Sequence, residues 1–112
     1  ECVLDVFINN NGNASFELAT SLFLNDLVLG TLAFPELADL DQDGRLDIVA
    51  LDGASVFVLL GEANAGLFSV PQVFEAPGNT FLAVGDLNGD TLLDLAITDF
   101  GGDEVVVLFS AP

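Results

Sequence analysis

The chain has 112 residues, of which 18 are Asp or Glu and one, Arg45, is basic, so its formal net charge is −17. Binding to nucleic acid or to anionic lipid depends mainly on Lys and Arg, and this composition excludes both as partners. The absence of His, Lys and Tyr removes most general-base and Schiff-base chemistry, and leaves carboxylate oxygens, which suit a hard cation.

The remaining composition is that of a folded protein. Hydrophobic residues make up 52 % of the chain and include 10 Phe, so the acidity does not indicate a disordered tail. The length suits one small domain. No run of 18 apolar residues occurs, and we therefore expect no membrane insertion.

The first expected element is a partial repeat at the start of the chain. Val6, Phe7 and Ile8, followed by a polar turn and Phe16, match residues 58–60, a turn and Phe68. Residues 21–32 are open to two interpretations, a helical turn or a hairpin turn at Asn25-Asp26.

The rest of the chain contains one unit twice. Residues 39–48 reappear as residues 86–95 at an offset of 47, and residues 56–60 match residues 105–109 at an offset of 49. Short strands recurring at this period indicate an all-β repeat architecture with one four-stranded sheet per repeat. The number of matched segments predicts two strands in the first, partial repeat, four in the second and three in the third.

Four segments read as short strands bounded by turn residues, at residues 47–51, 56–60, 94–98 and 105–109. Their apolar runs are nearly continuous, which predicts strands covered on both faces by stacked sheets. We expect most Phe residues in the core, including Phe57, Phe68, Phe81 and Phe109.

An acidic loop precedes the first of these strands. Asp39, Asp41, Asp43 and Asp47 occupy positions 1, 3, 5 and 9, with Gly44 at position 6 and the Arg45 backbone carbonyl at position 7. Alternate carboxylates in a tight loop can converge on one point, and six or seven oxygens suit Ca²⁺. We expect the Arg45 side chain to point outward. The alternative is a solvated hairpin in which the Asp residues make Asx turns.

A second loop repeats the pattern with two changes. Asp86, Asn88, Asp90 and Asp94 keep the ligand positions, and Leu92 keeps the backbone position. Asn88 is neutral, and Thr91 replaces the glycine at a position where a β-branched residue disfavours positive φ. We therefore predict two Ca²⁺ sites, with the 39–47 loop binding more strongly than the 86–94 loop.

Two other kinds of calcium loop do not fit. An EF-hand needs Glu at position 12, where this chain has Ala50, and both EF-hand and dockerin loops need flanking helices. Asp52 and Asp99 recur at one repeat position, and we expect their side chains to cap the turn that follows each strand.

The two loops, each followed by short strands and a Gly/Asn turn ending in Phe68 in the first copy, resemble the FG-GAP/VCBS repeat of integrin-α-like β-propellers. The resemblance implies propeller blades with Ca²⁺ in the loop between the first and second strands of a blade. It divides the chain into a partial blade (1–28), a full blade (29–78) and an incomplete blade (79–112). The implied ligands are Asp39, Asp41, Asp43, Arg45 (backbone) and Asp47, then Asp86, Asn88, Asp90, Leu92 (backbone) and Asp94.

The resemblance also implies an extracellular protein, secreted or at the cell surface. We expect a non-enzymatic structural or adhesion module that binds copies of itself by strand addition at apolar edges, residues 3–8 and 105–109, as an oligomer or filament. The alternative is a fragment of a larger propeller that binds carbohydrate or protein. A glycosidase-like hydrolase is disfavoured because the clustered carboxylates are the expected metal ligands.

Overall fold

The computed structural model describes residues 2–10, 15–24, 33–64, 67–99 and 101–110. These residues form nine strands: β1 (Cys2–Asn10), β2 (Ser15–Leu24), β3 (Ala33–Ala38), β4 (Asp47–Leu51), β5 (Ser55–Leu59), β6 (Gln72–Glu75), β7 (Asn79–Gly85), β8 (Asp94–Asp99) and β9 (Glu104–Leu108). None of the described residues belongs to a helix that is long and apolar enough to cross a membrane.

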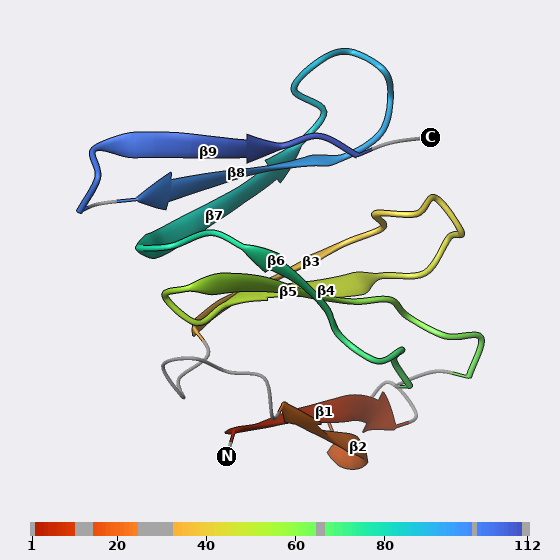
Figure 1. The fold of residues 1–112 in the computed structure, drawn as a ribbon. Coiled ribbons are helices and arrows are strands. Elements are labelled where there is room, and N and C mark those ends of the chain that lie inside the picture. The colour runs from red at the N-terminus through yellow and green to blue at the C-terminus, as the bar shows by residue number, and fades with distance from the viewer. Residues whose placement is uncertain (1, 11–14, 25–32, 65–66, 100, 111–112) are drawn as a thin grey trace.

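The described strands form three antiparallel sheets with the strands in chain order. Sheet 1 is β1-β2, sheet 2 is β3-β4-β5-β6 and sheet 3 is β7-β8-β9. Figure 1 shows them as three layers, with sheet 2 between the other two. The all-β prediction is confirmed, and sheets of two, four and three strands are consistent with a partial propeller-like fold. The repeat boundaries at 28/29 and 78/79 stay predictions.

The predicted strands lie within one residue of the observed ones at both ends. Residues 21–24 of the ambiguous segment belong to β2, so a helical turn there is wrong. Residues 25–32, including the alternative hairpin turn, lie outside the described residues.

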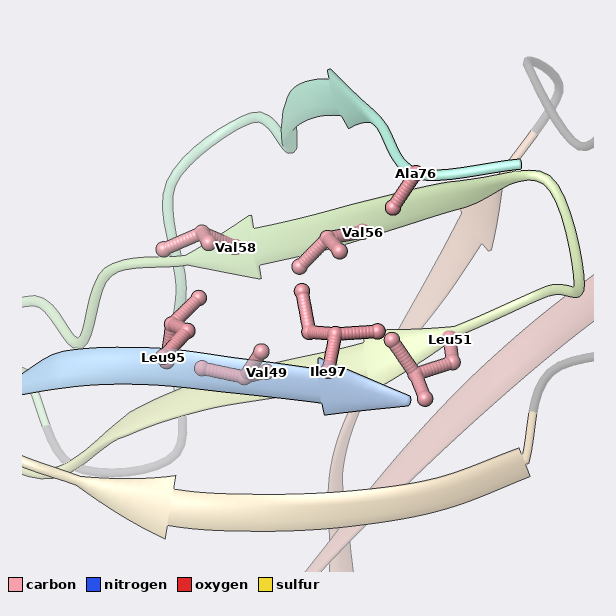
Figure 2. Close-up of a cluster of buried hydrophobic side chains, with 7 residues drawn as sticks. All are labelled: Val49, Leu51, Val56, Val58, Ala76, Leu95 and Ile97. Carbon is pink, nitrogen blue, oxygen red and sulfur yellow. The ribbon is translucent and has the colours of Figure 1, made fainter. Parts of the chain in front are cut away.

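Apolar side chains fill the space between neighbouring sheets. Between sheets 2 and 3, the core consists of Val49, Leu51, Val56, Val58, Ala76, Leu95 and Ile97 (Figure 2). Between sheets 1 and 2, Ile48, Phe57 and Leu59 contact Leu4, Val6 and Phe68. Every residue of β4 and β5 is buried, because sheet 2 is covered on both faces.

The expectation of burial is wrong for β9 and for most of the described Phe side chains. Phe57 is buried and Phe68 is half-buried, whereas Phe7, Phe16, Phe74, Phe81 and Phe109 are exposed. In β9, Val105 and Val107 are exposed and Val106 is half-buried. The reason is geometric, since sheets 1 and 3 are each covered on one face only by the described residues.

Carboxylates cap the turns that follow β4 and β8, as predicted. Asp52 accepts hydrogen bonds from the backbone N–H groups of Ala54 (2.9 Å) and Ser55 (2.6 Å). Asp99 accepts one from the N–H of Gly102 (2.9 Å). These bonds satisfy backbone donors that a tight turn leaves without partners.

A buried amide joins sheet 3 to sheet 2. The Asn79 side chain, at the start of β7, donates to the carbonyls of Ser55 (3.0 Å) and Ala76 (2.9 Å). It accepts a hydrogen bond from the N–H of Gly53 (2.8 Å), in the turn between β4 and β5. This connection fixes the start of β7 against the turn between β4 and β5.

Candidate metal centre

The first acidic loop joins β3 to β4, the first and second strands of sheet 2. Two of its residues have left-handed backbone, Gln42 (φ 60°) and Gly44 (φ 84°). A side chain at position 44 would meet no atom within 4 Å, so glycine is favoured there by backbone conformation and not by space.

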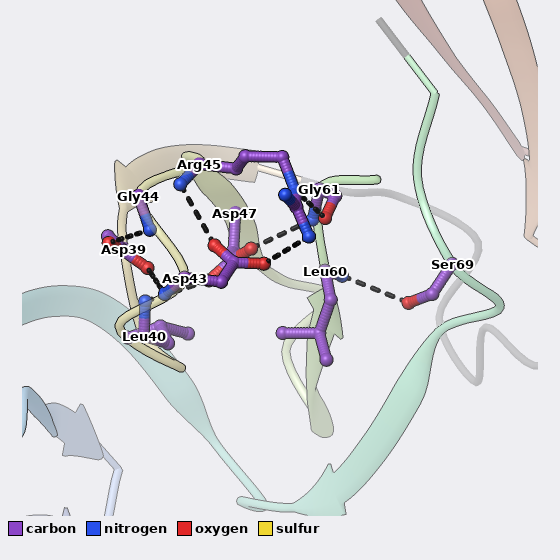
Figure 3. A network of polar contacts seen from close by, with 9 residues as sticks. All are labelled: Asp39, Leu40, Asp43, Gly44, Arg45, Asp47, Leu60, Gly61 and Ser69. Carbon is purple, nitrogen blue, oxygen red and sulfur yellow. Dashed lines mark hydrogen bonds and ion pairs between the residues drawn. The ribbon is translucent and has the colours of Figure 1, made fainter. Parts of the chain in front are cut away.

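Two carboxylates organise this loop through backbone hydrogen bonds (Figure 3). Asp39 accepts from the N–H groups of Asp43 (3.1 Å) and Gly44 (2.8 Å). Asp43 accepts from the N–H of Arg45 (2.9 Å). These are the bonds that the solvated-hairpin interpretation predicts, and they also hold the loop carboxylates close together.

Three of the predicted ligands converge. One carboxylate oxygen from each of Asp39, Asp41 and Asp43 lies within 4.8 Å of the others. Loss of solvent around the carboxylate raises the pKa of Asp41, and the Asp47 and Asp43 charges add to the rise. The backbone N–H of Arg45 lowers the pKa of Asp43. The fold therefore disfavours the ionised form of Asp41 and favours that of Asp43.

The fourth predicted carboxylate, Asp47, has a different environment. It is fully buried at the start of β4, and it accepts hydrogen bonds from the N–H groups of Leu40 (2.7 Å) and Gly61 (2.8 Å). Among the described residues it is not part of the converging triad. Its two hydrogen bonds connect the start of β4 to the beginning of the loop, at Leu40, and to Gly61.

The Arg45 side chain is exposed, as expected, and it makes two contacts at the surface of the loop. Its guanidinium lies 2.8 Å from the Asp43 carboxylate, and its Nε donates to the carbonyl of Gly61 (3.2 Å). The ion pair forms because the one basic residue of the sequence belongs to the acidic loop and lies two residues after Asp43. A cation bound to Asp43 would share that carboxylate with Arg45.

The second loop, between β7 and β8, repeats the hydrogen bonds of the first. Asp86 accepts from the N–H groups of Gly89 (2.8 Å), Asp90 (3.2 Å) and Thr91 (2.8 Å). Asp90 accepts from the N–H of Leu92 (3.0 Å), as Asp43 does from Arg45. The Thr91 N–H is the main cause of a lowered pKa at Asp86.

The second loop brings a different set of carboxylates together. Here one oxygen from each of Asp86, Asp90 and Asp94 lies within 4.8 Å of the others. Asp94 is fully buried and accepts from the N–H groups of Leu87 (2.9 Å) and Ser110 (2.9 Å), which parallels Asp47. The neutral Asn88 side chain accepts from the N–H of Asp90 (3.3 Å).

Backbone strain is present in both loops. Thr91 has φ 73° and Gly89 has φ 80°, so each loop places one glycine and one other residue in the left-handed region. Left-handed backbone costs a β-branched residue more than it costs Gln, so Thr91 is the more strained position. The Gln42 side chain also donates to the Thr91 carbonyl (2.8 Å), which joins the two loops directly.

Three features of the loops were not predicted from the sequence: the left-handed conformation of Gln42, its hydrogen bond to Thr91, and the hydrogen bonds from Gly61 and Ser110 to the position-9 carboxylates. One signal was present, because the residue that corresponds to Gln42 in the second loop is Gly89. A glycine at either repeat position indicates where positive φ is needed.

Among the described residues, the two loops present two groups of three carboxylates, and all of these ligand atoms are oxygens. Such a donor set suits a hard divalent cation. The residues present therefore fit a metal ion of that class in each loop.

Comparison with family models found a match to the FG-GAP-like repeat over residues 39–97. A search of curated proteins and a search of solved structures each found no match. The matched region begins at the first residue of the first acidic loop, includes the whole second loop, and covers more than half of the chain. The chain therefore belongs to the FG-GAP-like repeat family.

Proposed function

We propose that the protein is a calcium-binding, non-enzymatic repeat module that works outside the cell through structure and adhesion. The observation that carries the proposal is the hydrogen-bond scheme that both loops share. In each loop the position-1 carboxylate binds the backbone of positions 5 and 6, and three carboxylates come within 4.8 Å of one another.

The residues fit Ca²⁺ better than other common metals. They offer carboxylate, amide and carbonyl oxygens and no nitrogen or sulfur, and Ca²⁺ accepts six to eight such ligands in a flexible geometry. The first ion would be held by Asp39, Asp41, Asp43, the Arg45 carbonyl and Asp47. The second would be held by Asp86, Asn88, Asp90, the Leu92 carbonyl and Asp94.

When bound, the ions supply positive charge at the points where carboxylates are forced together. Two divalent ions would offset four of the 17 excess negative charges, so they would reduce the self-repulsion that opposes folding. The loop carboxylates also stabilise the loops themselves. Asp39 and Asp86 accept hydrogen bonds from the backbone of their own loops. Asp47 and Asp94 bind backbone N–H groups next to the following strands, at Gly61 and Ser110.

Location outside the cell and absence of enzymatic activity are part of the same proposal. Calcium sites built on exposed loops fill readily where calcium is abundant, and the family is typically extracellular. The clustered carboxylates that could serve as acid and base are the same ones assigned to the metal. A turnover assay on polysaccharides tests this part directly, and sustained hydrolysis would contradict it.

We also propose that the module binds copies of itself. β9 is an edge strand of sheet 3 among the described strands, and Glu104 is its one charged residue. An apolar edge with few charges is open to pairing with a further strand. Addition of a strand from a second copy would join modules into an oligomer or filament.

One observation favours the alternative, a fragment that binds carbohydrate or protein. A groove of about 590 Å³ lies beside sheets 2 and 3, and its lining includes Leu60, Phe74, Phe109, Asp41 and Gln72. Apolar walls with a few polar groups are usual for ligand pockets. Specific binding on a glycan array, lost in Phe109→Asp, would support this alternative.

The calcium proposal is tested by melting curves in Ca²⁺, in Mg²⁺ and in chelator. A native-state ligand at one hundred times its Kd stabilises by about 2.7 kcal/mol per site. We expect a large rise of the melting temperature in Ca²⁺ and a smaller one in Mg²⁺. Identical curves in Ca²⁺ and chelator would refute the proposal.

A further inference from the structure

One face of sheet 3 is exposed along two rows of uncharged side chains, and Asp94, which comes next on the same face, is fully buried. Cross-strand pairing forms these rows, with Phe81 beside Thr98 and Val105 in one row, and Ala83 beside Ala96 and Val107 in the other. Phe81 is 59 % exposed and Val105 is 64 % exposed. We call these six residues the outer face of sheet 3.

The repeat relates the outer face of sheet 3 to a face of sheet 2 that is covered by another sheet. At offsets of 47 and 49, the counterparts of Ala96, Thr98, Val105 and Val107 are residues of sheet 2. Those counterparts are Val49, Leu51, Val56 and Val58, and all four are buried against sheet 3 (Figure 2). The outer face of sheet 3 is therefore the repeated surface that, in sheet 2, the following sheet covers.

The outer face of sheet 1 corresponds to the other face of sheet 2, the one that packs against sheet 1. Leu4 and Val6 contact sheet 2. The residues that alternate with them, together with their cross-strand partners, form the outer face of sheet 1: Val3, Asp5, Phe7, Asn9, Phe16, Leu18 and Ser21. At the offset of 52, Phe7 corresponds to Leu59, which sheet 2 buries against sheet 1.

We propose that the outer face of sheet 3 in one copy binds the outer face of sheet 1 in a second copy. The contact would continue the stack of sheets 1, 2 and 3 by the type of packing that the chain already uses twice (Figure 1). The proposal rests on the self-association proposed above but not on strand addition as its mode. The two modes are alternatives, because here the faces pack and the edges stay unpaired. The contact is heterologous and gives a ring or a filament.

Three features make this contact weak. Asp5 lies on the sheet 1 face at the position of the buried Phe57, and its carboxylate is bonded to the Ser21 hydroxyl (2.7 Å), so docking removes a charge from water. Strand spacings give sheet 3 a face about 14 Å wide and about 17 Å long, roughly 240 Å² in area. This is well below the roughly 800 Å² that each partner buries in a standard interface. Two copies with charge −17 also repel each other. We therefore expect association at high protein concentration, strengthened by salt, which screens that repulsion.

The test uses the whole chain in two variants that each block one face. Phe7→Glu places a charge on sheet 1, and Val105→Glu places one on sheet 3. Both side chains are more than half exposed, so we expect both variants to fold, which melting in Ca²⁺ checks. Val70→Glu is the matched control, because Val70 is 84 % exposed and lies on neither face.

Sedimentation velocity should show self-association of the unchanged protein and of Val70→Glu, and monomers of each blocked variant alone. The mixture of Phe7→Glu and Val105→Glu should form a species of about twice the monomer mass of 11.7 kDa, because one open face of each kind remains. In a third variant, Asp5→Leu, we expect self-association about tenfold tighter.

Other results overturn the proposal in distinguishable ways. Association that persists in both blocked variants indicates strand addition at an edge. Loss in Val105→Glu alone indicates a symmetric contact of two sheet 3 faces. An unchanged protein that stays monomeric at high concentration and salt excludes self-association altogether. None of these results bears on calcium binding, which the melting curves test separately.

Discussion

Replacing Asp41 by Asn should change stability in opposite directions with and without calcium. In the metal-free protein, the raised pKa of Asp41 means that folding disfavours its ionised form. A carboxyl whose pKa is higher in the folded state destabilises the fold at neutral pH, and this effect disappears as the pH falls below the unfolded value. In chelator at pH 7, Asp41→Asn should therefore melt at a higher temperature than the unchanged protein.

In calcium the same substitution removes one of the three converging carboxylates of the first loop. If the site then stays empty, the free energy of unfolding falls by the contribution of one filled site, which is about 2.7 kcal/mol when the Ca²⁺ concentration is one hundred times the Kd. For a chain of 112 residues this corresponds to a melting temperature lower by about 10 °C.

The control is Glu104→Gln, which removes an exposed negative charge outside both loops. It reports the general benefit of lower net charge, and Asp41→Asn should exceed it in chelator and fall below it in calcium. Differential scanning calorimetry in both solutions measures the four shifts. If Asp41→Asn and Glu104→Gln behave alike in both, the reasoning about Asp41 is refuted.

Three further predictions concern the loops. Isothermal titration should show a larger loss of calcium affinity for Asp43→Ala than for Asp90→Ala, because the first loop is the less strained one; equal losses would contradict that order. In chelator, Thr91→Gly should stabilise by about 1 kcal/mol through relief of left-handed strain, and Gln42→Gly by less, since it also loses its bond to the Thr91 carbonyl; urea unfolding measures both. Because the pKa of Asp86 is lowered in the fold, its contribution to stability is present above the ordinary Asp pKa and is lost as the pH falls through the folded value. The metal-free melting temperature should therefore fall less steeply with acid in Asp86→Asn, and an unchanged slope would contradict the assignment.

Much of the fold could be predicted because its signals are local. Asp and Gly mark the turns, and short runs such as residues 47–51 are too apolar and too brief for anything other than buried strands. The repeat then indicated the number of strands, two, four and three, because two copies of one pattern are expected to fold alike. The capping by Asp52 followed from the same local chemistry.

The candidate site was less predictable because its geometry depends on residues distant in sequence. Asp47 faces the N–H of Gly61, and Asp94 faces that of Ser110, across the sheet. Spacing within the loops could not reveal those partners, nor that three carboxylates converge from positions 1, 3 and 5 in one loop and 1, 5 and 9 in the other. The exposed Phe81 shows the same limit, because composition does not tell which faces of a stack stay uncovered.

The most direct test of the central claim is a calorimetric titration of the chelator-treated protein with Ca²⁺. The two loops predict binding of two ions per chain, and one ion per chain in a variant with Asp39, Asp41 and Asp43 all replaced by Asn. Binding of two ions by that variant, or no calcium binding by the unchanged protein, would contradict the assignment of the metal centres to these loops.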